Sequence, residues 1–338
     1  MHDIIQDMKG NIRVFVRIRP YVPNDNEQHT YETFLISPDD HTITVYTDTK
    51  TMHYNFDRIF SHLSTQNDIF EEVEQFIQSA LDGYHICLFS YGQTGSGKTY
   101  TMTGSDVHGR DAGIVPRSIS KILQTSQEMK AQGWDFSISV SFIECYNNKL
   151  FDLLSDDTNG ITMSQIQHQP TKMLVPGLTV VTVNNEREIF SLMEIAVTKR
   201  STAQTMMNDH SSRSHFVFTM YIQSHNSQKS VTYDGCVHLC DLAGSERTER
   251  SQVVGERQKE TNFINTSLTS LGRVFSLLAK KSTHIPYRDS ILTWYLQHAF
   301  TKNGKTAMIV NLSPTIASSQ ESLSSLRFAM EASQVHLG

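Results

Sequence analysis

Apolar residues along this chain recur with two different periods, which predict strands and helices in alternation. In residues 11–19 an aliphatic residue occupies every second position, and this pattern predicts a β-strand. Residues 66–81 place apolar side chains three and four apart, as a helix requires, and Gly83 just beyond them is a typical helix stop. The further predicted elements are strands at Ile86–Tyr91, Phe136–Tyr146, His215–Gln223, Val231–Asp241 and Thr306–Leu312, and helices at Glu186–Ala203, Arg257–Lys281, Tyr287–Thr301 and after Pro314.

This alternation favours one architecture. Strands joined by helical crossovers run parallel and bury both faces of their sheet, so a central, mostly parallel (mixed) β-sheet flanked by helices on both faces is expected. No repeat, low-complexity segment or linker divides the pattern. The chain is therefore predicted to form one three-layer αβα domain of the α/β class, with Met1–Met8 as the tail of a preceding helix.

Composition supports a folded protein and narrows its class. Hydrophobic residues make up 38% of the 338 residues, and no apolar run approaches the roughly 20 residues that a membrane crossing needs. The net charge of −6 argues against a protein that binds nucleic acid over its whole surface. The four cysteines do not form a secreted disulfide framework, so a reducing compartment is expected.

Charge is distributed unevenly along the chain. The stretch from Arg247 to Lys305 contains ten basic and four acidic residues, although the whole chain is acidic. Each of these side chains taken alone is better explained by an ordinary solvated helix face. As a region, they suggest a surface for an acidic partner.

The segment Gly92–Thr99, G-Q-T-G-S-G-K-T, matches the phosphate-binding pattern G-x-x-x-x-G-K-[ST]. Glycines let backbone N–H groups curl around phosphate oxygens, and the N-terminus of the following helix adds partial positive charge. Lys98 would neutralise the β and γ phosphates, and the Thr99 hydroxyl would ligate Mg²⁺. A chance glycine-rich turn is the alternative, which the flanking strand and helix disfavour. The chain is thus predicted to be a P-loop NTPase that binds nucleotide through Gln93, Thr94, Gly95, Ser96, Gly97, Lys98 and Thr99.

Two more polar segments extend this site. Asp241 ends an apolar strand and opens the segment D-L-A-G-S-E, where it would hold Mg²⁺ through water while Gly244 offers an N–H to a γ-phosphate. The segment Asn208–His215, N-D-H-S-S-R-S-H, supplies an arginine and hydroxyl groups for Mg²⁺ and phosphate. Taken separately, each segment is more readily explained by a capped turn.

In this order and spacing, the three segments together resemble the kinesin motor domain. The resemblance covers residues 10–338, and residues 1–9 would be the end of a neck helix or coiled coil. The segment K-G-N-I-R-V-F at residues 9–15 is similar to the class whose motor is C-terminal and moves toward the minus end of the microtubule. Further matches are R-I-R-P at Arg17–Pro20, S-F-I-E-C-Y-N at Ser141–Asn147, H-I-P-Y-R-D-S at His284–Ser290, V-N-L-S-P at Val310–Pro314 and S-L-R-F-A at Ser325–Ala329.

The resemblance implies a role for each part of the site. Residues near the adenine would be Arg17, Arg19, Pro20 and Tyr100, with the tyrosine stacked on the base. The two switches, which respond to the γ-phosphate, would consist of Asn208, Ser211, Ser212, Asp241, Gly244 and Glu246. An ion pair between Arg213 and Glu246 would close around the γ-phosphate and help to position the attacking water. Magnesium would be held by Thr99, Ser212 and, through water, Asp241. The predicted helix at Arg257–Lys281 would relay phosphate loss to the microtubule.

The same resemblance assigns the basic region to the acidic surface of the microtubule. The expected contact residues are Arg247, Arg250, Lys259, Arg273, Lys280, Lys281 and Arg288. Four positions depart from the family pattern: Thr266, Ile291 and Glu331 where lysine is usual, and His298 where aspartate is usual. Arg273, where an acidic or amide residue is common, would partly compensate. Loss of contact cations weakens encounter and affinity, and does so more at high salt.

The predicted function is a microtubule-stimulated ATPase that couples hydrolysis of MgATP to force or movement. Its partners would be the microtubule and a dimer partner bound through an N-terminal coiled coil, with no nucleic acid and no membrane. The expected location is the cytoplasm, on microtubules or the spindle. An alternative is a microtubule-binding structural module or heterodimer partner with weak motility of its own. A small-molecule kinase or nucleic-acid translocase is disfavoured, because no acceptor-site motif or aromatic–basic interleaving is present.

The segment C-V-H-L-C at Cys236–Cys240 has the residue types of a metal site. On a strand that rises about 3.3 Å per residue the two cysteines would lie about 13 Å apart. Zinc ligands bind at about 2.0–2.3 Å, so one ion cannot reach both cysteines. We therefore expect this segment to be strand core, and His284 and His298 to be surface or structural residues.

Overall fold

The computed structural model describes residues 12–25, 34–46, 50–169, 173–205, 210–246 and 256–335, and for 203–205, 210–211 and 256–265 it describes the backbone alone. Residues 1–9, expected to be the end of a neck helix, lie outside these ranges. Within the described ranges, no helix has both the length and the apolar character that a membrane span requires.

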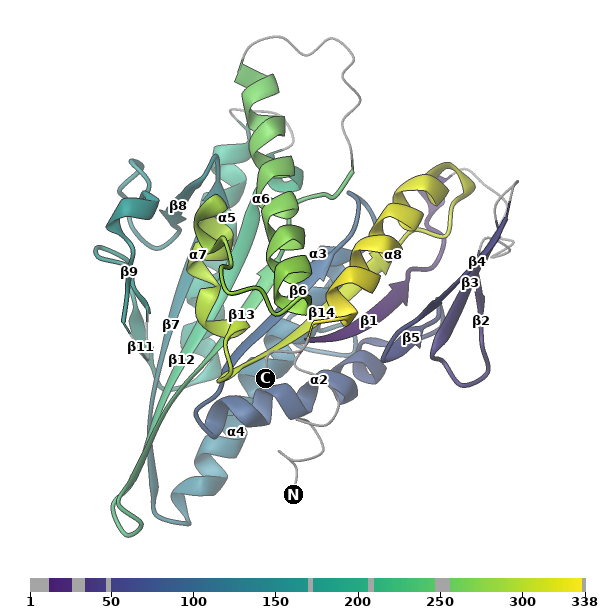
Figure 1. The fold of residues 1–338 in the computed structure, drawn as a ribbon. Coiled ribbons are helices and arrows are strands. Elements are labelled where there is room, and N and C mark those ends of the chain that lie inside the picture. The colour runs from purple at the N-terminus through teal and green to yellow at the C-terminus, as the bar shows by residue number, and fades with distance from the viewer. Residues whose placement is uncertain are drawn as a thin grey trace.

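A nine-stranded mixed β-sheet forms the middle layer, with strand order β11-β7-β12-β13-β6-β14-β1-β5 and with β8 paired to β7 (Figure 1). The block β13-β6-β14-β1-β5 is parallel, whereas β12, β7, β8 and β11 pair antiparallel. The strands are β1 Ile12–Ile18, β5 Arg58–Phe60, β6 His85–Tyr91, β7 Trp134–Tyr146, β8 Lys149–Asp152, β11 Val181–Val183, β12 His215–Asn226, β13 Val231–Asp241 and β14 Gly304–Leu312. The predicted α/β class and mixed sheet are confirmed, and the parallel block is the part that contains the strand before the P-loop.

Helices cover both faces of this sheet. One face packs against α6, α7 and α8, which lie in front of the sheet in Figure 1, and the other packs against α2, α3, α4 and α5. The helices are α2 Gln66–Leu81, α3 Lys98–Met102, α4 Ile114–Lys130, α5 Glu186–Thr205, α6 Glu256–Ala279, α7 Ile291–Tyr295 and α8 Ser319–Ser333. The three layers inferred from the sequence are therefore present.

The alternation in β1 distributes its side chains between two cores. Val14 and Val16 pack in the core on the α6–α8 side, and Phe15 packs in the core on the α2–α5 side. The arginines Arg13 and Arg17 are buried as well, because β1 lies between β14 and β5 with helices on both faces. A period-2 pattern thus does not place polar positions in solvent when a strand is interior.

Local chemistry sets the ends of α2. Thr65 accepts a hydrogen bond from the Asp68 N–H while the Asp68 carboxylate accepts from the Thr65 N–H, which is a capping box. At the other end Gly83 has φ of 92°, a left-handed conformation that terminates the helix as expected.

The helix predicted at Tyr287–Thr301 is wrong as a single element. The segment breaks into a 3₁₀ turn at Tyr287–Asp289, α7 at Ile291–Tyr295 and a second 3₁₀ turn at Gln297–Phe300. Ser290 is extended (φ −145°, ψ 153°), and its side chain accepts from the Thr293 N–H, so it begins a new helix. An N-cap residue inside an otherwise helical apolar pattern interrupts the helix.

Several elements were not predicted from the sequence. They are α4, the strands β5, β8 and β11, a small sheet of β2 Phe34–Ile36, β3 Thr42–Tyr46 and β4 Thr51–Asn55, a hairpin of β9 Gln167–His168 and β10 Met173–Leu174, and 3₁₀ turns at Pro23–Asp25, Met163–Gln165, His210–Arg213 and Ile316–Ser318.

Candidate functional site

The loop after β6 has the backbone shape of a phosphate cradle. Residues 92–97 join β6 to α3, and Gly92 and Gly97 have φ angles of 147° and 97°. A Cβ on Gly92 would collide with the Asn311 carbonyl oxygen and with Ser96 Oγ, so glycine is required there. Gly97 is the N-cap residue of α3, which places Lys98 in the first helical turn.

Lys98 is buried inside this loop. Its Nζ donates to the Gln93 carbonyl oxygen at 2.9 Å, and the residue is only 8% exposed. Burial lowers the pKa of Lys98, and the charges of Asp241 and Glu246 oppose that shift. The ammonium group therefore stands in a shielded position, where its attraction for an anionic phosphate is stronger than in water.

Asp241 lies at the end of β13, next to Ser90 of β6 in the parallel register. Its carboxylate accepts hydrogen bonds from Thr99 Oγ1 at 2.6 Å and Ser90 Oγ at 3.2 Å. Among the described residues no group of three histidines, cysteines or acids forms a metal cage. A carboxylate beside a threonine hydroxyl fits Mg²⁺, which binds through one or two carboxylates together with phosphate and water.

The segment 241–246 is folded against the P-loop. The Glu246 carboxylate accepts from the Thr94 N–H at 2.8 Å and from Thr94 Oγ1 at 2.5 Å. The Ser245 N–H donates to the Gly92 carbonyl oxygen at 3.1 Å, and the Gly244 N–H donates to the Ser212 carbonyl oxygen at 2.8 Å. The two segments predicted as switches therefore meet each other and the P-loop at one place.

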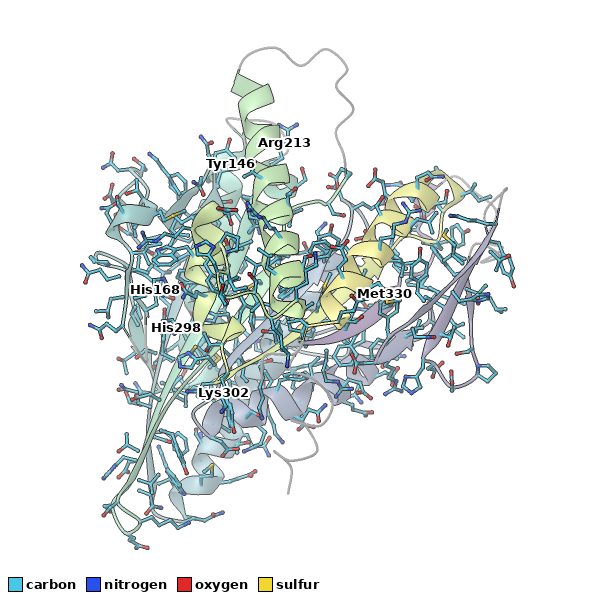
Figure 2. All side chains as sticks on the ribbon, viewed as in Figure 1. Tyr146, His168, Arg213, His298, Lys302 and Met330 are labelled. Carbon is cyan, nitrogen blue, oxygen red and sulfur yellow. The ribbon has the colours of Figure 1, made fainter. Side chains whose placement is uncertain are left out.

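The ion pair between Arg213 and Glu246 is expected only around a γ-phosphate, so it stays a prediction, and in the described residues no ion pair joins these two side chains. Glu246 contacts Thr94 instead. Ser212 and Arg213 belong to the 3₁₀ turn at His210–Arg213, and Figure 2 shows Arg213 near α6. Asn208 and the Ser211 side chain lie outside the described part of the structure.

His215 is a site residue whose role the sequence did not indicate. Its Nδ1 accepts from the Ala243 N–H at 3.0 Å, so the ring proton is on Nε2, which lies 2.7 Å from Ser267 Oγ of α6. Burial lowers the pKa of His215 to about 3, and the ring is neutral at physiological pH. One side chain thus connects the segment after β13 to α6.

A buried polar cluster supports the turn that precedes His215. Ser214 Oγ donates to Glu144 Oε1 at 2.5 Å, and Arg200 Nε lies 3.3 Å from the same carboxylate oxygen. The Arg200 guanidinium also donates to the Ser214 carbonyl oxygen at 3.2 Å. Glu144 belongs to the S-F-I-E-C-Y-N match, so that motif anchors Ser214, just before His215, to the sheet.

The four residues expected near the adenine differ in exposure and in their contacts. Pro20 is exposed, and Tyr100 is 39% exposed. Arg19 reaches the P-loop, where its Nε donates to the Gly95 carbonyl oxygen at 2.8 Å, and it pairs with Asp25 at 2.7 Å. Arg17 is buried and does not face an open surface, so we expect it to support neighbouring side chains.

The residues expected to contact the microtubule also differ in their positions. Arg247 and Arg250, and the side chain of Lys259, lie outside the described part of the structure. The exposed residues are Arg273, Lys280, Lys281 and Arg288. Arg273 pairs with Asp289 at 2.8 Å, and the Arg288 guanidinium lies 4.4 Å from the centre of the Trp294 ring.

Two residues that we counted toward this surface are buried, and a third is partly buried. Ile291 is 2% exposed, and Lys305 is 7% exposed with its Nζ 3.2 Å from Ser79 Oγ. His298 is partly buried, with its Nε2 3.2 Å from His168 Nδ1. Of the four departures Thr266 and Glu331 are exposed, so these two alter the described surface most directly.

The cysteine segment packs in the sheet. Cys236 Sγ lies 3.5 Å from His238 Nε2 and 3.1 Å from His85 Nδ1, while Cys240 Sγ lies 4.0 Å from Cys87 Sγ. The two cysteines thus have different neighbours, as expected for strand core.

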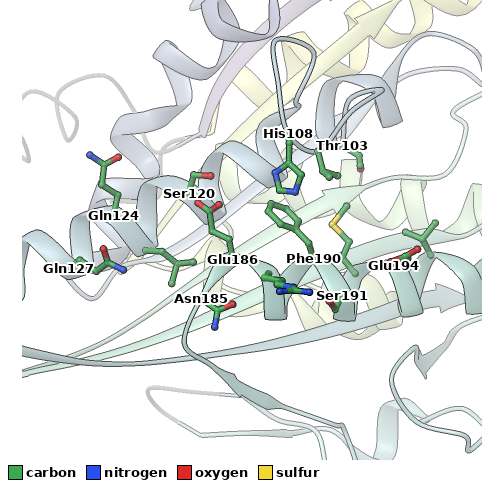
Figure 3. Close-up of a pocket in the computed structure, with 15 residues that line it drawn as sticks. Thr103, His108, Ser120, Gln124, Gln127, Asn185, Glu186, Phe190, Ser191 and Glu194 are labelled. Atoms are coloured by element: carbon green, nitrogen blue, oxygen red, sulfur yellow. The ribbon is translucent and has the colours of Figure 1, made fainter.

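A separate cavity of about 1120 Å³ lies between α4 and α5, beside the loop that joins α3 to α4 (Figure 3). Phe190 of α5 and His108 of that loop meet edge to face at its wall, with ring centres 4.7 Å apart. The sequence did not indicate this cavity, because its lining comes from three separate segments.

Comparison with known proteins agrees with this geometry. The model of the kinesin motor domain matches residues 17–335. Carboxy-terminal kinesin 2 of Xenopus laevis is 40% identical over 100% of this chain and 55% of its own length, and kinesin-like protein KIN-14N of Oryza sativa subsp. japonica is 41% identical over 100% and 45%. The chain therefore spans about half the length of these curated relatives.

Solved structures show the same similarity. The C-terminal motor and motor homology domain of Kar3Vik1, fused to a synthetic heterodimeric coiled coil, has a TM-score of 0.89 at 37% identity, and covers 98% of this chain and 87% of that one. The motor domain of the Kar3-like kinesin from Ashbya gossypii has a TM-score of 0.82 at 35% identity, over 96% and 99%. The structure brings two polar segments onto a P-loop, and the fold is shared over nearly the whole chain. These findings have one explanation: this chain belongs to the kinesin motor domain family.

Proposed function

We propose that this chain is an ATP-driven microtubule motor domain of the C-terminal-motor class, with movement toward the minus end. The observation that supports it best is the contact of Glu246 with Thr94 and of Gly244 with Ser212, because it brings both switch segments onto the P-loop. A site built in this way can respond to the presence of a γ-phosphate. The similarity to Carboxy-terminal kinesin 2 supports the class.

The proposed chemistry needs no covalent intermediate. Phosphoryl transfer is mostly positioning and charge stabilisation, so the backbone of residues 93–97 and Lys98 bind the phosphates. Thr99, Ser212 and Asp241 would hold Mg²⁺, which neutralises charge on the phosphate oxygens when bound. Gly244 would exchange its hydrogen bond to Ser212 for one to the γ-phosphate. Glu246 would leave Thr94 and pair with Arg213, which closes the site around the attacking water.

The path from this site to the microtubule begins at His215. Because its ring bonds both Ala243 and Ser267 of α6, a movement of the segment after β13 displaces that helix. Exposed Arg273 and Lys280, near the C-terminal end of α6, would meet the acidic microtubule surface. This is a rigid-body switch governed by phosphate contacts.

The further partners of the whole protein are also proposals. Residues 1–9 would end a coiled coil that binds a dimer partner, in keeping with the heterodimeric coiled coil named for the Kar3Vik1 fusion. The protein would then act on cytoplasmic microtubules, including those of the spindle.

The test is the ATPase rate against microtubule concentration at two salt concentrations. We expect a large stimulation that weakens as salt rises. Lys98→Ala should abolish nucleotide binding, whereas Glu246→Ala should retain binding and lose hydrolysis. A rate that does not change at saturating microtubules and low salt overturns the proposal, and normal hydrolysis by Glu246→Ala overturns the role of that residue.

A microtubule-binding module with weak motility is the second candidate. Thr266 and Glu331 favour it, since both are exposed where the family usually places lysine. Gliding of microtubules over surface-attached protein separates the two functions. Sustained gliding supports the motor, and tight binding without gliding supports the module.

A further inference from the structure

A second cavity, of about 400 Å³, lies on the sheet face that packs against α6–α8. Its floor is formed by β13 and the start of β6, one wall by residues 173–180, and the other by α7 and the 3₁₀ turn after it. We call it the histidine pocket, because His85, His238 and His298 line it together with Cys236. Its volume is within the range of about 300–1,000 Å³ that is typical of small-molecule sites.

The polar groups at the floor of the histidine pocket are close together. Cys236 Sγ lies 3.1 Å from His85 Nδ1 and 3.5 Å from His238 Nε2. Burial lowers the pKa of His238 to about 3 and that of His298 below its usual value, and it raises the pKa of Cys236 to about 12. At neutral pH the floor therefore offers the neutral ring of His238 and a thiol.

The rest of the lining restricts the class of ligand. None of the described residues that line the pocket is a lysine or arginine, and Asp234 stands on the wall, so anions are disfavoured. The segment 173–180 contributes aliphatic side chains, and Tyr221 and Tyr295 contribute aromatic ones. Among the described residues no group of three or more histidines, cysteines, aspartates or glutamates is arranged so that it could hold a metal ion, which disfavours a metal ion here. A flat apolar molecule with a neutral N–H or ring nitrogen matches both the walls and the floor.

The histidine pocket is also connected to an exposed cation. Arg288 lies 4.4 Å from the centre of the Trp294 ring, and that ring centre is 3.9 Å from the centre of His168. His168 Nδ1 lies 3.2 Å from Nε2 of His298, which lines the pocket, and Figure 2 shows the two rings side by side. A ligand that displaces the His298 ring must move this row of contacting groups, at whose end Arg288 lies.

We propose that the histidine pocket binds a small, uncharged heteroaromatic molecule and that its occupancy changes microtubule affinity through His298, His168, Trp294 and Arg288. The ligand is held by hydrogen bonds and apolar contacts. It forms no bond to Cys236, because a buried thiol with a raised pKa is a poor nucleophile. The effect on microtubules rests on the proposed motor function, whereas binding in the pocket does not.

Benzimidazole, neutral at pH 7.5, is a suitable probe and is titrated calorimetrically into the protein saturated with MgADP. We expect saturable binding that Ser137→Trp weakens at least tenfold, since Ser137 lines the pocket and is exposed on β7. Asp135→Trp is the matched control, because it lies on the same face of the same strand but outside the lining. Equal binding by both variants, no saturation, or binding of Zn²⁺ in place of benzimidazole would each overturn the pocket assignment.

Microtubule co-sedimentation with and without benzimidazole tests the connection. We expect the apparent Kd for microtubules to change at least threefold in the wild-type protein and in Asp135→Trp, and to stay constant in Ser137→Trp. Binding without any change in microtubule Kd overturns the connection through Arg288. Failure to bind microtubules even without benzimidazole overturns the proposed motor function and leaves the calorimetric result intact.

Discussion

The guanidinium carbon of Arg17 lies 5.2 Å from the centre of the Tyr100 ring, on the buried side of that ring. Arg17 also donates to Gln66 Oε1 and Thr101 Oγ1, each at 2.9 Å, and is 6% exposed. Gln66 in turn donates to the Tyr100 carbonyl oxygen at 2.6 Å. Arg17 therefore supports Tyr100 through these contacts. The direct contact of Arg17 with the adenine, which the resemblance implies, stays a prediction.

Substitution of Arg17 by methionine should remove its support of Tyr100. The change removes a buried cation and leaves two hydrogen-bond acceptors without their donor, so we expect the free energy of unfolding to fall by about 3 kcal/mol. Affinity for ADP should fall as well, because the Tyr100 ring loses its cation–π contact. Urea unfolding and a fluorescent-ADP titration measure the two effects.

The control for this experiment is Tyr100→Phe, which keeps the ring over Arg17 and removes only the hydroxyl that contacts Asp111 at 3.3 Å. It should change both quantities little. If Arg17→Met loses stability but binds ADP like the wild type, Arg17 does not position Tyr100.

Asp241→Asn should reduce the dependence of nucleotide retention on magnesium. The carboxylate accepts from Thr99, and the amide that replaces it has the same size but no charge. Groups that orient metal ligands typically contribute 10–100-fold to metal affinity, so we expect the slowing of ADP release by Mg²⁺ to shrink at least tenfold. Stopped-flow release of labelled ADP with and without EDTA measures it. Ser90→Ala, which keeps the carboxylate, should retain most of the effect, and an unchanged Asp241→Asn protein contradicts the assignment.

Acid should destabilise this domain partly through His215. Burial lowers its pKa to about 3 in the folded state, whereas an unfolded histidine titrates near about 6.5. Between these two values the unfolded chain binds a proton that the folded chain excludes, so stability is present above about pH 6.5 and is lost as the pH falls. The expected loss is about 1.4 kcal/mol per pH unit for each such group.

His215→Gln should remove that contribution, so its free energy of unfolding should fall less steeply than that of the wild type between pH 6 and pH 4.5. Urea unfolding at several pH values measures the slope. His284→Gln is the control, because His284 is exposed, and it should leave the slope unchanged. Equal slopes for wild type and His215→Gln would falsify the neutral, buried state of this ring.

Microtubule affinity should rise when Asp289 is replaced by asparagine. Asp289 pairs with Arg273 at 2.8 Å, and the two side chains are 38% and 64% exposed. The substitution removes an acidic group and releases Arg273 for the acidic microtubule, so we expect a two- to threefold lower Kd at low salt and a smaller gain at high salt. Arg273→Ala should have the opposite effect. Lys305→Met, at a buried position, should leave the Kd unchanged, and a loss of affinity there contradicts the surface assignment.

Most elements near the nucleotide loop were predictable because their signals are local. The apolar run at Ile86–Tyr91, the glycine spacing after it and Lys98 are adjacent in the chain, and each constrains the backbone directly. The helix at Gln66–Leu81 has its cap, its apolar period and its stop within 20 residues. Antiparallel partners of the sheet were harder to predict, because a strand pattern does not state which strand lies beside it.

The errors share one cause. Ile291 and Lys305 were counted toward a surface because their neighbours in sequence are charged, yet a break at Ser290 and the course of β14 bury them. The sequence likewise could not show that Cys236 would meet His85, a residue 151 positions away. Burial is decided by what packs against a segment, and that partner is distant in sequence.

The sequence by itself determined the fold class, the family and the order of the parts of the nucleotide site, because hydrophobic period, glycine positions and motif spacing act over a few residues. Only the tertiary structure decided that Arg17 supports Tyr100, that the Glu246 carboxylate accepts hydrogen bonds from Thr94, and that His215 joins the segment after β13 to α6. Those contacts join residues brought together by sheet order and helix packing, and the free energy that selects them comes from burial of the whole core.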